Sequence, residues 1–253
     1  IKKEYGRKRR TAIENAEEAV YEEKKMEEME VCFLMDRFGY MKLIDKNAYE
    51  RNKEAVHNEN KYVFNCMNTD KICIFTDTGK MHTIKAVDIP LGRFRDKGTP
   101  VDNLSNYDSS QERMLYVAPV GQLRSDRLLF VTKTSMCKLV EGAEFDVAKR
   151  TIASTKLADE DELIFIGSAS EMEQIVLQSH GGCFLRFLAQ EVSTMKKTAL
   201  GVRGMKLADD DYLEHAYLLA GHQEYTISYH DKEYALNKVR LAKRDTKGIK
   251  PRI

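Results

Sequence analysis

The chain has 253 residues, 42% of them hydrophobic, which is enough for one large β domain or two ordinary domains. Its 41 Lys and Arg residues nearly balance 40 Asp and Glu residues, so the bulk charge does not indicate a nucleic-acid partner. No apolar run is long enough to cross a bilayer and no signal peptide is recognisable, so no membrane partner is expected. Five cysteines stand singly without a CxxC pair, which predicts reduced thiols and a cytoplasmic protein.

Residues 1–30 are the one stretch expected to be helical, because they are rich in Glu, Lys, Arg and Ala. Within them, residues 14–30 hold eight acidic and two basic residues, whereas residues 238–253 hold seven basic residues and one acidic residue. The neutral total therefore hides an acidic start and a basic end, and such local charge steers partners. We assign a short helical segment and an acidic linker to residues 1–30, and a β domain to residues 31–253.

Strand–turn–strand patterns begin at Val31 and recur five times. The paired apolar runs span residues 31–35 and 40–44, 71–75 and 80–84, 127–131 and 136–140, 174–177 and 183–187, and 225–229 and 233–236. Gly39, Gly79 and Gly182 stand at turn positions, where a positive φ favours glycine. Ser135 and Lys232 stand there in the other two hairpins and depart from the pattern.

A second repeat supports the same period. The motif Lys-Leu-Ala-Asp, continued by acidic residues and a leucine, occurs at residues 156–163 and again at residues 206–213. A period of about fifty residues is typical of propeller-like arrays, in which each unit is one small sheet. The sequence therefore predicts an all-β radial array of about five blades of antiparallel strands. The acidic residues 159–162 and 209–211 are expected to be solvated rather than metal-binding, because no third ligand type accompanies them.

Basic clusters follow four of the five hairpins, each on a loop about twenty residues further on. Each of these four units thus places a cluster of bases on an equivalent loop. Gly98, Gly204 and Gly248 are expected to form turns in these loops. The bases of these clusters are Arg93, Arg95, Lys97, Lys149, Arg150, Lys196, Lys197, Arg203, Lys206, Lys243, Arg244 and Lys247.

Catalytic and metal-binding patterns are missing from the sequence. The six histidines stand singly, and none has the helical spacing of a zinc site. We therefore predict no catalytic residue, no metal and no cofactor in this chain. The alternative is a protein-binding β-propeller of the WD or kelch type, although no Trp-Asp or Gly-Gly signature recurs. A propeller enzyme would need convergent acids or a metal cluster, and the sequence offers neither.

Four stretches carry a family resemblance: residues 75–79, Ile89-Pro90, residues 95–98 and residues 201–207. In these stretches the chain resembles the C-terminal β-pinwheel domain of type IIA topoisomerase A subunits, namely those of DNA gyrase and of topoisomerase IV. Residues 4–11 resemble the last stretch of the helical breakage-reunion domain, just before the linker. The resemblance implies a β-pinwheel that binds and bends duplex DNA without sequence preference and presents a segment for strand passage. The bases of the four clusters are then the candidate DNA-binding residues, because cations repeated once per blade around a curved edge would neutralise DNA phosphates and bend the duplex without reading its bases.

The same resemblance bears on partners and chemistry. In that family the catalytic tyrosine, the metal site and the ATPase lie outside this segment, so the chain alone is not expected to be an enzyme. The implied partners are double-stranded DNA, the ATPase B subunit of the enzyme, and the rest of the topoisomerase A subunit. The implied location is the bacterial cytoplasm, in association with the nucleoid.

One stretch departs from the gyrase pattern. Gyrase carries a glycine-rich basic box in its first repeat, which is needed for chiral wrapping. The corresponding residues 49–58 contain no glycine, and Glu54 stands among the bases. The box is therefore absent or degenerate. Together with five units rather than six, this favours the topoisomerase IV type or a gyrase-like paralogue that wraps DNA weakly.

Overall fold

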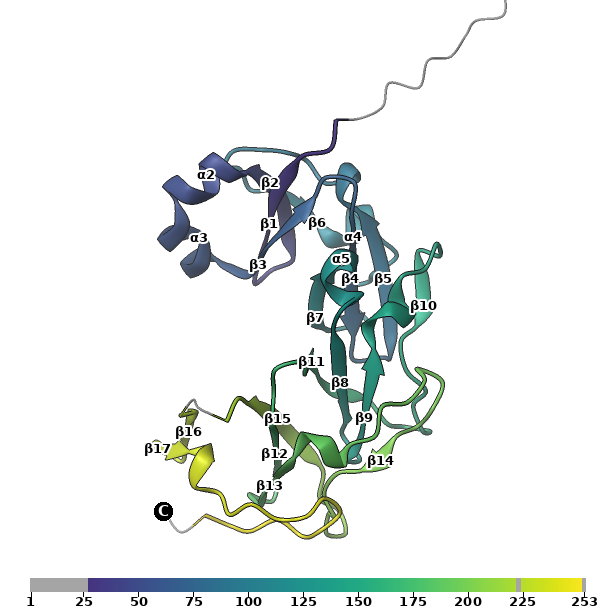
Figure 1. Cartoon of the computed structure of the whole chain (residues 1–253), viewed down its shortest axis with the longest axis vertical. Coiled ribbons are helices and arrows are strands. Elements are labelled where there is room, and N and C mark those ends of the chain that lie inside the picture. The colour runs from purple at the N-terminus through teal and green to yellow at the C-terminus, as the bar shows by residue number, and fades with distance from the viewer. Residues whose placement is uncertain (1–26, 222–223, 252–253) are drawn as a thin grey trace, which may run out of the picture.

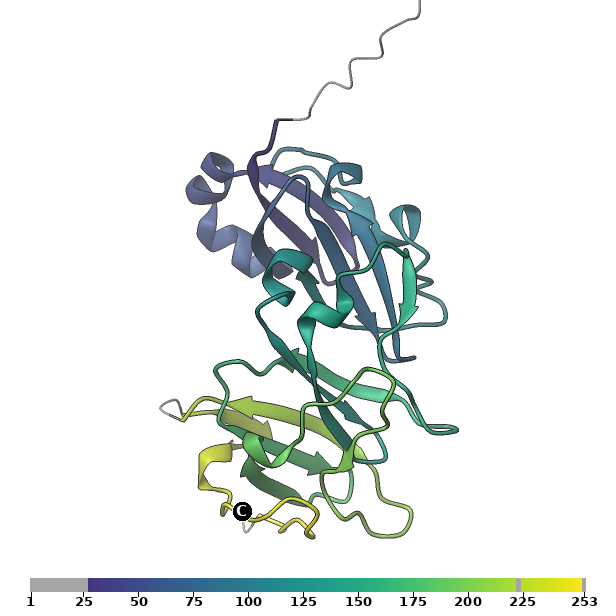
Figure 2. The same ribbon diagram turned by 45° about the vertical axis from the view of Figure 1, so that its right-hand side comes forward.

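The computed structural model describes residues 27–221 and 224–251, and this part of the chain is nearly all β. Five antiparallel sheets, here called blades 1 to 5, follow one another along an open arc shaped like a letter C (Figures 1 and 2). The predicted all-β pinwheel of about five blades is therefore confirmed. Residues 1–26, with most of the predicted helical segment and acidic linker, lie outside the described residues.

Each blade is built on one of the five predicted hairpins. Blade 1 has the order β3 (Asn60–Met67), β1 (Glu30–Asp36), β2 (Tyr40–Asp45), β6 (Thr99–Pro100). Blade 2 has the order β10 (Thr151–Ala153), β5 (Lys80–Lys85), β4 (Lys71–Thr76), β7 (Met114–Pro119). Blade 3 has the order β11 (Leu163–Ser168), β8 (Arg127–Thr132), β9 (Met136–Glu141), β14 (Val202–Arg203). Blade 4 has the order β13 (Phe184–Leu188), β12 (Gln174–Ser179), β15 (Leu213–Leu219), and blade 5 pairs β16 (Thr226–Tyr229) with β17 (Lys232–Ala235).

An outer strand of blades 1 to 3 comes from the unit of the next blade. Strand β6 follows β5 of blade 2 in sequence, yet it pairs with β2 of blade 1. In the same way β10 follows β9 but pairs with β5, and β14 follows β13 but pairs with β9. In blade 4 an isolated bridge between Phe184 and Ile249 takes this place. Each unit, meaning a hairpin and the segment after it, is thus hydrogen-bonded to the blade before it.

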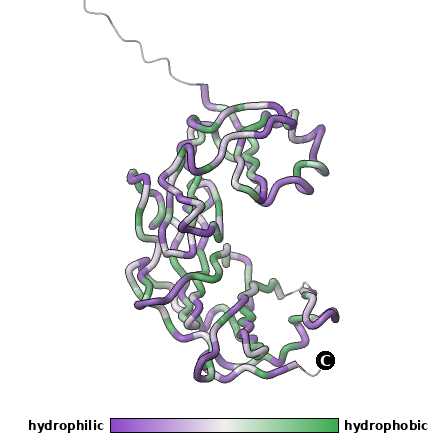
Figure 3. The backbone as a smooth tube through the Cα atoms, turned by 180° about the vertical axis from the view of Figure 1, so that it is seen from behind, coloured by the Kyte–Doolittle hydropathy of each residue, from purple (hydrophilic) through white to green (hydrophobic). Residues whose placement is uncertain are grey.

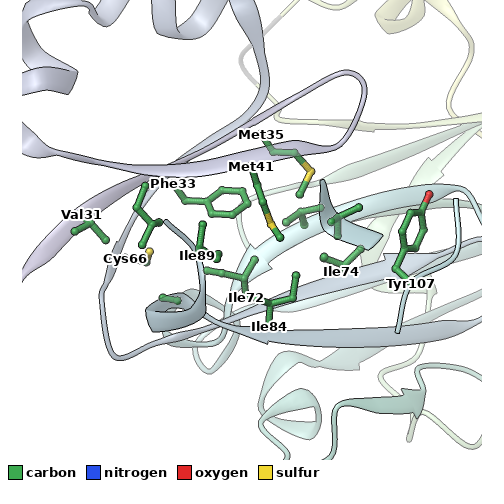
Figure 4. Close-up of a cluster of buried hydrophobic side chains, with 14 residues drawn as sticks. Val31, Phe33, Met35, Met41, Cys66, Ile72, Ile74, Ile84, Ile89 and Tyr107 are labelled. Carbon is green, nitrogen blue, oxygen red and sulfur yellow. The ribbon is translucent and has the colours of Figure 1, made fainter. Parts of the chain in front are cut away.

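The core lies between the blades, which stack face to face. Alternate residues of β1 and β4, such as Phe33 and Ile72, point into one cluster between blades 1 and 2 (Figure 4). Similar clusters separate blades 2 and 3, 3 and 4, and 4 and 5. Because the central strands are covered on both faces, they read as continuous apolar runs. Figure 3 shows hydrophobic residues along the strands and largely hydrophilic loops.

Two short helices cover the free face of blade 1. Helices α2 (Lys46–Arg51) and α3 (Lys53–Glu59) connect β2 to β3. The Val56 side chain on α3 is fully buried with Cys32 and Leu34 of β1. A terminal unit of a stacked array needs such a cover, since no neighbour buries its outer face. Residues 49–58, which were expected to correspond to the glycine-rich box, lie in these helices and at Asn52 between them.

The expectation of helix in residues 1–30 alone was incomplete. Besides α2 and α3, the described residues contain α4 (Val101–Leu104) and α5 (Val120–Leu123). Four single 3₁₀ turns follow the hairpins: η1 (Ala86–Asp88), η2 (Gly142–Phe145), η3 (Ala189–Glu191) and η4 (Leu236–Lys238). Pieces this short have little helical signal of their own and depend on packing. No helix in the described ranges is long and apolar enough to span a membrane.

The hairpin turns explain the two sequence departures. Ser135 has φ 71°, the same left-handed conformation as the three predicted turn glycines. Its hydroxyl oxygen accepts a hydrogen bond from the Met205 amide at 2.7 Å, so a serine at this position fastens the segment just after β14. In the fifth hairpin His230 and Asp231 make the left-handed turn, and Lys232, predicted at the turn, is the first residue of β17.

Candidate nucleic-acid interface

The four basic loops lie along the outer edges of successive blades. The loop of residues 91–98 starts at Leu91, which is bridged to Leu43, and ends at β6 on blade 1. The loops of residues 194–201 and 241–248 start and end in the same manner on blades 3 and 4. The loop of residues 146–150 is shorter and leads into β10 on blade 2. Hydrogen bonding to the preceding blade therefore gives the predicted basic clusters equivalent places.

Glycines close the three longer loops. At Gly98, Gly201 and Gly248 an added Cβ would lie 2.6–2.9 Å from a carbonyl oxygen of the preceding blade's second strand. Gly98 and Gly201 also have positive φ, 83° and 107°. Real Cβ atoms do not approach backbone so closely, so only glycine allows the loop to return to the blade. Gly204, which was expected to form a turn in its loop, instead lies just after β14, where an added Cβ would come within 2.6 Å of the Cys137 and Leu177 side chains.

Most of the predicted bases are exposed on these loops. Lys197 and Arg244 are the exceptions, since both are half-buried at equivalent positions. The Nζ of Lys197 donates to the Glu144 carbonyl at 2.9 Å, and the Nε of Arg244 donates to the Glu191 carbonyl at 3.1 Å. These two side chains brace one loop against the preceding unit. The exposed members are Arg93, Arg95, Lys97, Lys149, Arg150, Lys196, Arg203, Lys206, Lys243 and Lys247.

Two of the exposed bases have acidic partners. Arg203 pairs with Asp245 through its Nε and through Nη2, which lies 3.1 Å from Oδ2, and this guanidinium lowers the pKa of Asp245. Lys196 lies 3.4 Å from Glu144, with its side chain 81% exposed. Exposed ion pairs contribute little to stability, so either base can exchange its carboxylate for another anion at small cost.

A further base was missed by the sequence reasoning. Lys156 is the counterpart of Lys206 in the repeated Lys-Leu-Ala-Asp motif, and both are exposed. The Lys156 amide donates to the Lys197 carbonyl at 3.1 Å, so the next basic loop lies directly beside it. Lys149, Lys156 and Lys197 line one hollow of about 580 Å³ between two loops. The repeated motif could have revealed Lys156, because Lys206 was among the predicted bases and Lys156 holds the same position in the other copy.

The acidic repeat has a structural role that the sequence reading did not foresee. Its third acid, Asp161 or Asp211, is half-buried and accepts a hydrogen bond from the hairpin turn of its own blade. The donors are the Thr134 amide at 3.0 Å and the Gly181 amide at 2.9 Å. The acids before it are exposed, as expected. Within residues 27–221 and 224–251, no group of His, Cys, Asp and Glu side chains could hold a metal ion.

A buried polar network underlies the shortest basic loop. The Nε2 of His82 lies 3.0 Å from Oε2 of Glu112, and both side chains are almost fully buried. Lys80 approaches the other oxygen of Glu112 at 3.2 Å. Burial acts to raise the pKa of Glu112, but hydrogen bonds from His82 and its neighbours outweigh it and hold the pKa below its usual value. This network fixes β5 and the segment before β7 together.

A family model described as the DNA gyrase C-terminal domain, beta-propeller, matches residues 70–109, 126–170 and 173–220. The A subunit of DNA gyrase from Clostridium acetobutylicum is 29% identical over 215 residues, which cover 81% of this chain and 26% of that protein. The A subunit of DNA gyrase from Mycoplasma genitalium is 26% identical over 268 residues, covering 99% and 32%. The chain thus spans about a quarter to a third of the length of these relatives.

Solved structures show the same fold. The C-terminal domain of DNA topoisomerase IV has a TM-score of 0.76 at 22% identity, covering 88% of this chain and 72% of that one. The E. coli ParC C-terminal domain has a TM-score of 0.69 at 15% identity, covering 88% and 94%. A DNA gyrase A C-terminal domain has a TM-score of 0.58 at 18% identity, covering 87% and 76%.

Proposed function

This chain belongs to the family of DNA gyrase C-terminal β-propeller domains, and from that premise we propose that it binds and bends duplex DNA without sequence preference. The observation that carries the proposal is the recurrence of exposed bases at equivalent outer edges of blades 1 to 4. A duplex presents phosphates continuously, so a binder without base readout needs cations at several points along it. Cations on a curved edge offset the cost of bending by adding contacts.

In this proposal the domain positions DNA and makes or breaks no bond. It is one part of a bacterial type IIA topoisomerase A subunit, working in the cytoplasm with the rest of that polypeptide and with an ATPase B subunit. It presents a DNA segment for strand passage and needs no cofactor of its own. The supporting evidence is the family membership together with gyrase A relatives three to four times as long as the matched stretch.

The first blade bears on how strongly the domain wraps DNA. Where gyrase carries its glycine-rich box, this chain has α2 and α3, and Val56 of α3 is buried against β1. A segment packed in this way covers a blade and is not free to clamp DNA. We therefore expect little positive writhe when a nicked circle is relaxed around the domain and ligated. Strong positive supercoiling in that assay would show that the box is not needed here and would favour a gyrase-type role.

A gel-shift titration on linear duplex tests DNA binding directly. The logarithm of affinity should fall linearly with the logarithm of salt concentration, by about 0.9 for each phosphate neutralised. An Arg93→Ser/Arg95→Ser variant should lower that slope by up to about 1.8. The matched control is Lys85→Ser/Arg127→Ser, which removes the same charge from exposed positions outside the basic loops.

Absence of salt-sensitive binding would rule the proposal out and leave a protein-binding propeller. Equal losses in the two double variants would also contradict it, because they would show that net charge matters and the loop edge does not.

A further inference from the structure

Two lysines do not behave as surface lysines. The third residue of the hairpin's second strand is Lys42 in blade 1 and Lys138 in blade 3. Lys42 is half-buried, and Lys138 is only 1% exposed. In the described part of the chain neither ammonium forms a salt bridge with a carboxylate.

Both ammonium groups instead bind carbonyl oxygens of the basic loop that crosses their blade. The Nζ of Lys138 donates to the carbonyls of Lys197, at 2.8 Å, and Ala199, at 2.6 Å. The Nζ of Lys42 donates to the carbonyls of Phe94 and Asp96. The two pairs of acceptors hold the same positions relative to the closing glycines Gly201 and Gly98. The arrangement is therefore built twice, on blades 1 and 3.

These contacts determine where the loop amides point. In a trans peptide the N–H is directed opposite to its C=O, so a carbonyl turned towards a buried lysine aims the following amide away from it. The four amides concerned have no hydrogen-bond partner within residues 27–221 and 224–251, and they are called here the outward amides. They belong to Arg95, Lys97, Thr198 and Leu200.

The buried charge also makes each loop more attractive to anions. Burial lowers the pKa of Lys42 and lowers that of Lys138 to about 8, so at neutral pH the Lys138 ammonium is still charged. Backbone amides that point to one side of a loop are the donors of known backbone anion sites, and here a buried cation adds positive charge behind them. Arg93 and Lys196 extend from the same loops.

We propose that Lys42 and Lys138 are positioning residues that turn two loops into backbone phosphate sites, whose outward amides donate to phosphodiester oxygens of DNA. This inference rests on the proposed DNA binding and specifies its chemistry. The lysines themselves do not reach the phosphate. They hold the peptide planes that do, and the exposed loop bases supply the remaining charge.

Blades 2 and 4 lack this arrangement. In blade 2 the corresponding residue is His82, which is engaged with Glu112, and the loop that follows is the short one. In blade 4 it is Arg186, whose Nη1 donates to the Asn237 carbonyl, so its loop is held by Arg244 instead. The phosphate sites are therefore expected on alternate blades, 1 and 3.

The test compares a buried lysine with an exposed one on the same domain. Lys138→Met removes the ammonium under a loop, and Lys149→Met removes one exposed charge from the short loop on blade 2. Affinity for a linear duplex should fall about tenfold or more in Lys138→Met, because the loop no longer holds its outward amides towards the phosphates. Lys149→Met should lower the slope of log affinity against log salt concentration by about 0.9, the value for one phosphate contact.

A second readout isolates the amides. On titrating the labelled wild-type domain with a short duplex, the amide resonances of Thr198 and Leu200 should shift downfield, and in Lys138→Met this shift should disappear. A melting curve shows whether Lys138→Met is folded, and Lys42→Met, at a half-buried site, gives the same comparison on blade 1 if it is not. The inference would be overturned if the Thr198 and Leu200 amide resonances of the wild type did not shift when DNA binds, or if Lys138→Met and Lys149→Met lost equal affinity. Failure of the wild type to bind any duplex would instead refute the proposed function.

Discussion

The acidic repeat yields a prediction about stability that its charge alone would not suggest. Replacing Asp161 by Ala should destabilise the domain, whereas replacing Asp159 by Ala should not. The Asp161 carboxylate accepts from the Thr134 amide at 3.0 Å, the Thr134 hydroxyl at 2.6 Å and the Glu162 amide at 3.0 Å. Asp159 is exposed and makes no hydrogen bond among the described residues.

The magnitude follows from those bonds and from the exposure of the site. Hydrogen bonds to a charged group contribute about 1.5–3 kcal/mol when buried, but Asp161 is only half-buried and water replaces part of the loss. We expect a decrease of about 1–2 kcal/mol in the free energy of unfolding, or about 2–8 °C in Tm for a domain of this size.

Differential scanning calorimetry on Asp161→Ala and Asp159→Ala at one ionic strength measures the contrast, and Asp211→Ala with Asp209→Ala repeats it on blade 4. Asp159→Ala should stay within about 0.5 kcal/mol of the wild type. If both members of each pair lowered Tm equally, the carboxylates would not be acting as turn caps, and the repeat would need another explanation.

Three further changes separate backbone, electrostatic and packing effects. Gly201→Ala should cost about 2–4 kcal/mol in urea unfolding, because φ is 107° and the new Cβ would lie 2.7 Å from the Cys137 carbonyl. Gly121→Ala should cost less, because its φ is not positive and the new Cβ would meet a side chain, the Asp70 carboxylate, and no backbone atom. Glu112→Gln should lower the free energy of unfolding by about 1–3 kcal/mol at pH 7. Since the pKa of Glu112 is lowered on folding, the wild type loses this advantage as pH falls below the ordinary carboxyl range, so the difference between variant and wild type should shrink. A difference that is the same at pH 7 and pH 3 would contradict this. Val56→Ala should cost about 1.5–3 kcal/mol without changing the salt slope of DNA binding, and a reduced slope would show that α3 contacts the duplex.

The blades were predictable because their signal is local. Central strands buried on both faces appear as apolar runs, and a glycine or its substitute marks each turn, so hairpins such as β4–β5 could be placed from the sequence. Strands β6 and β14, each two residues long, could not, because they form only by pairing with the preceding blade. Helix α3 has one buried residue, Val56, and no periodicity to announce it.

The interface was predictable in outline but not in detail. Clusters of bases at a constant place in the repeat located the loops, yet nothing in the sequence separates Lys243, which is exposed, from Arg244, which braces its loop against Glu191. Lys138 was unforeseeable for a related reason. A lysine in a strand normally extends to water. Only the return of the next unit's loop over blade 3 surrounds this one with carbonyls.

The exchange of strands connects the fold to the proposed function. Each of the three longer basic loops begins and ends on the preceding blade, so its position is set by a neighbour and not by its own hairpin. The braces from Lys197 to Glu144 and from Arg244 to Glu191 tie each of these loops to the 3₁₀ turn of the preceding unit. The spacing of the cations is therefore fixed by how the blades stack, and a duplex that follows them takes its curvature from the core. It follows that loosening an exchanged strand such as β14 should change the bend imposed on DNA more than the number of phosphates contacted, whereas removing exposed bases should do the reverse.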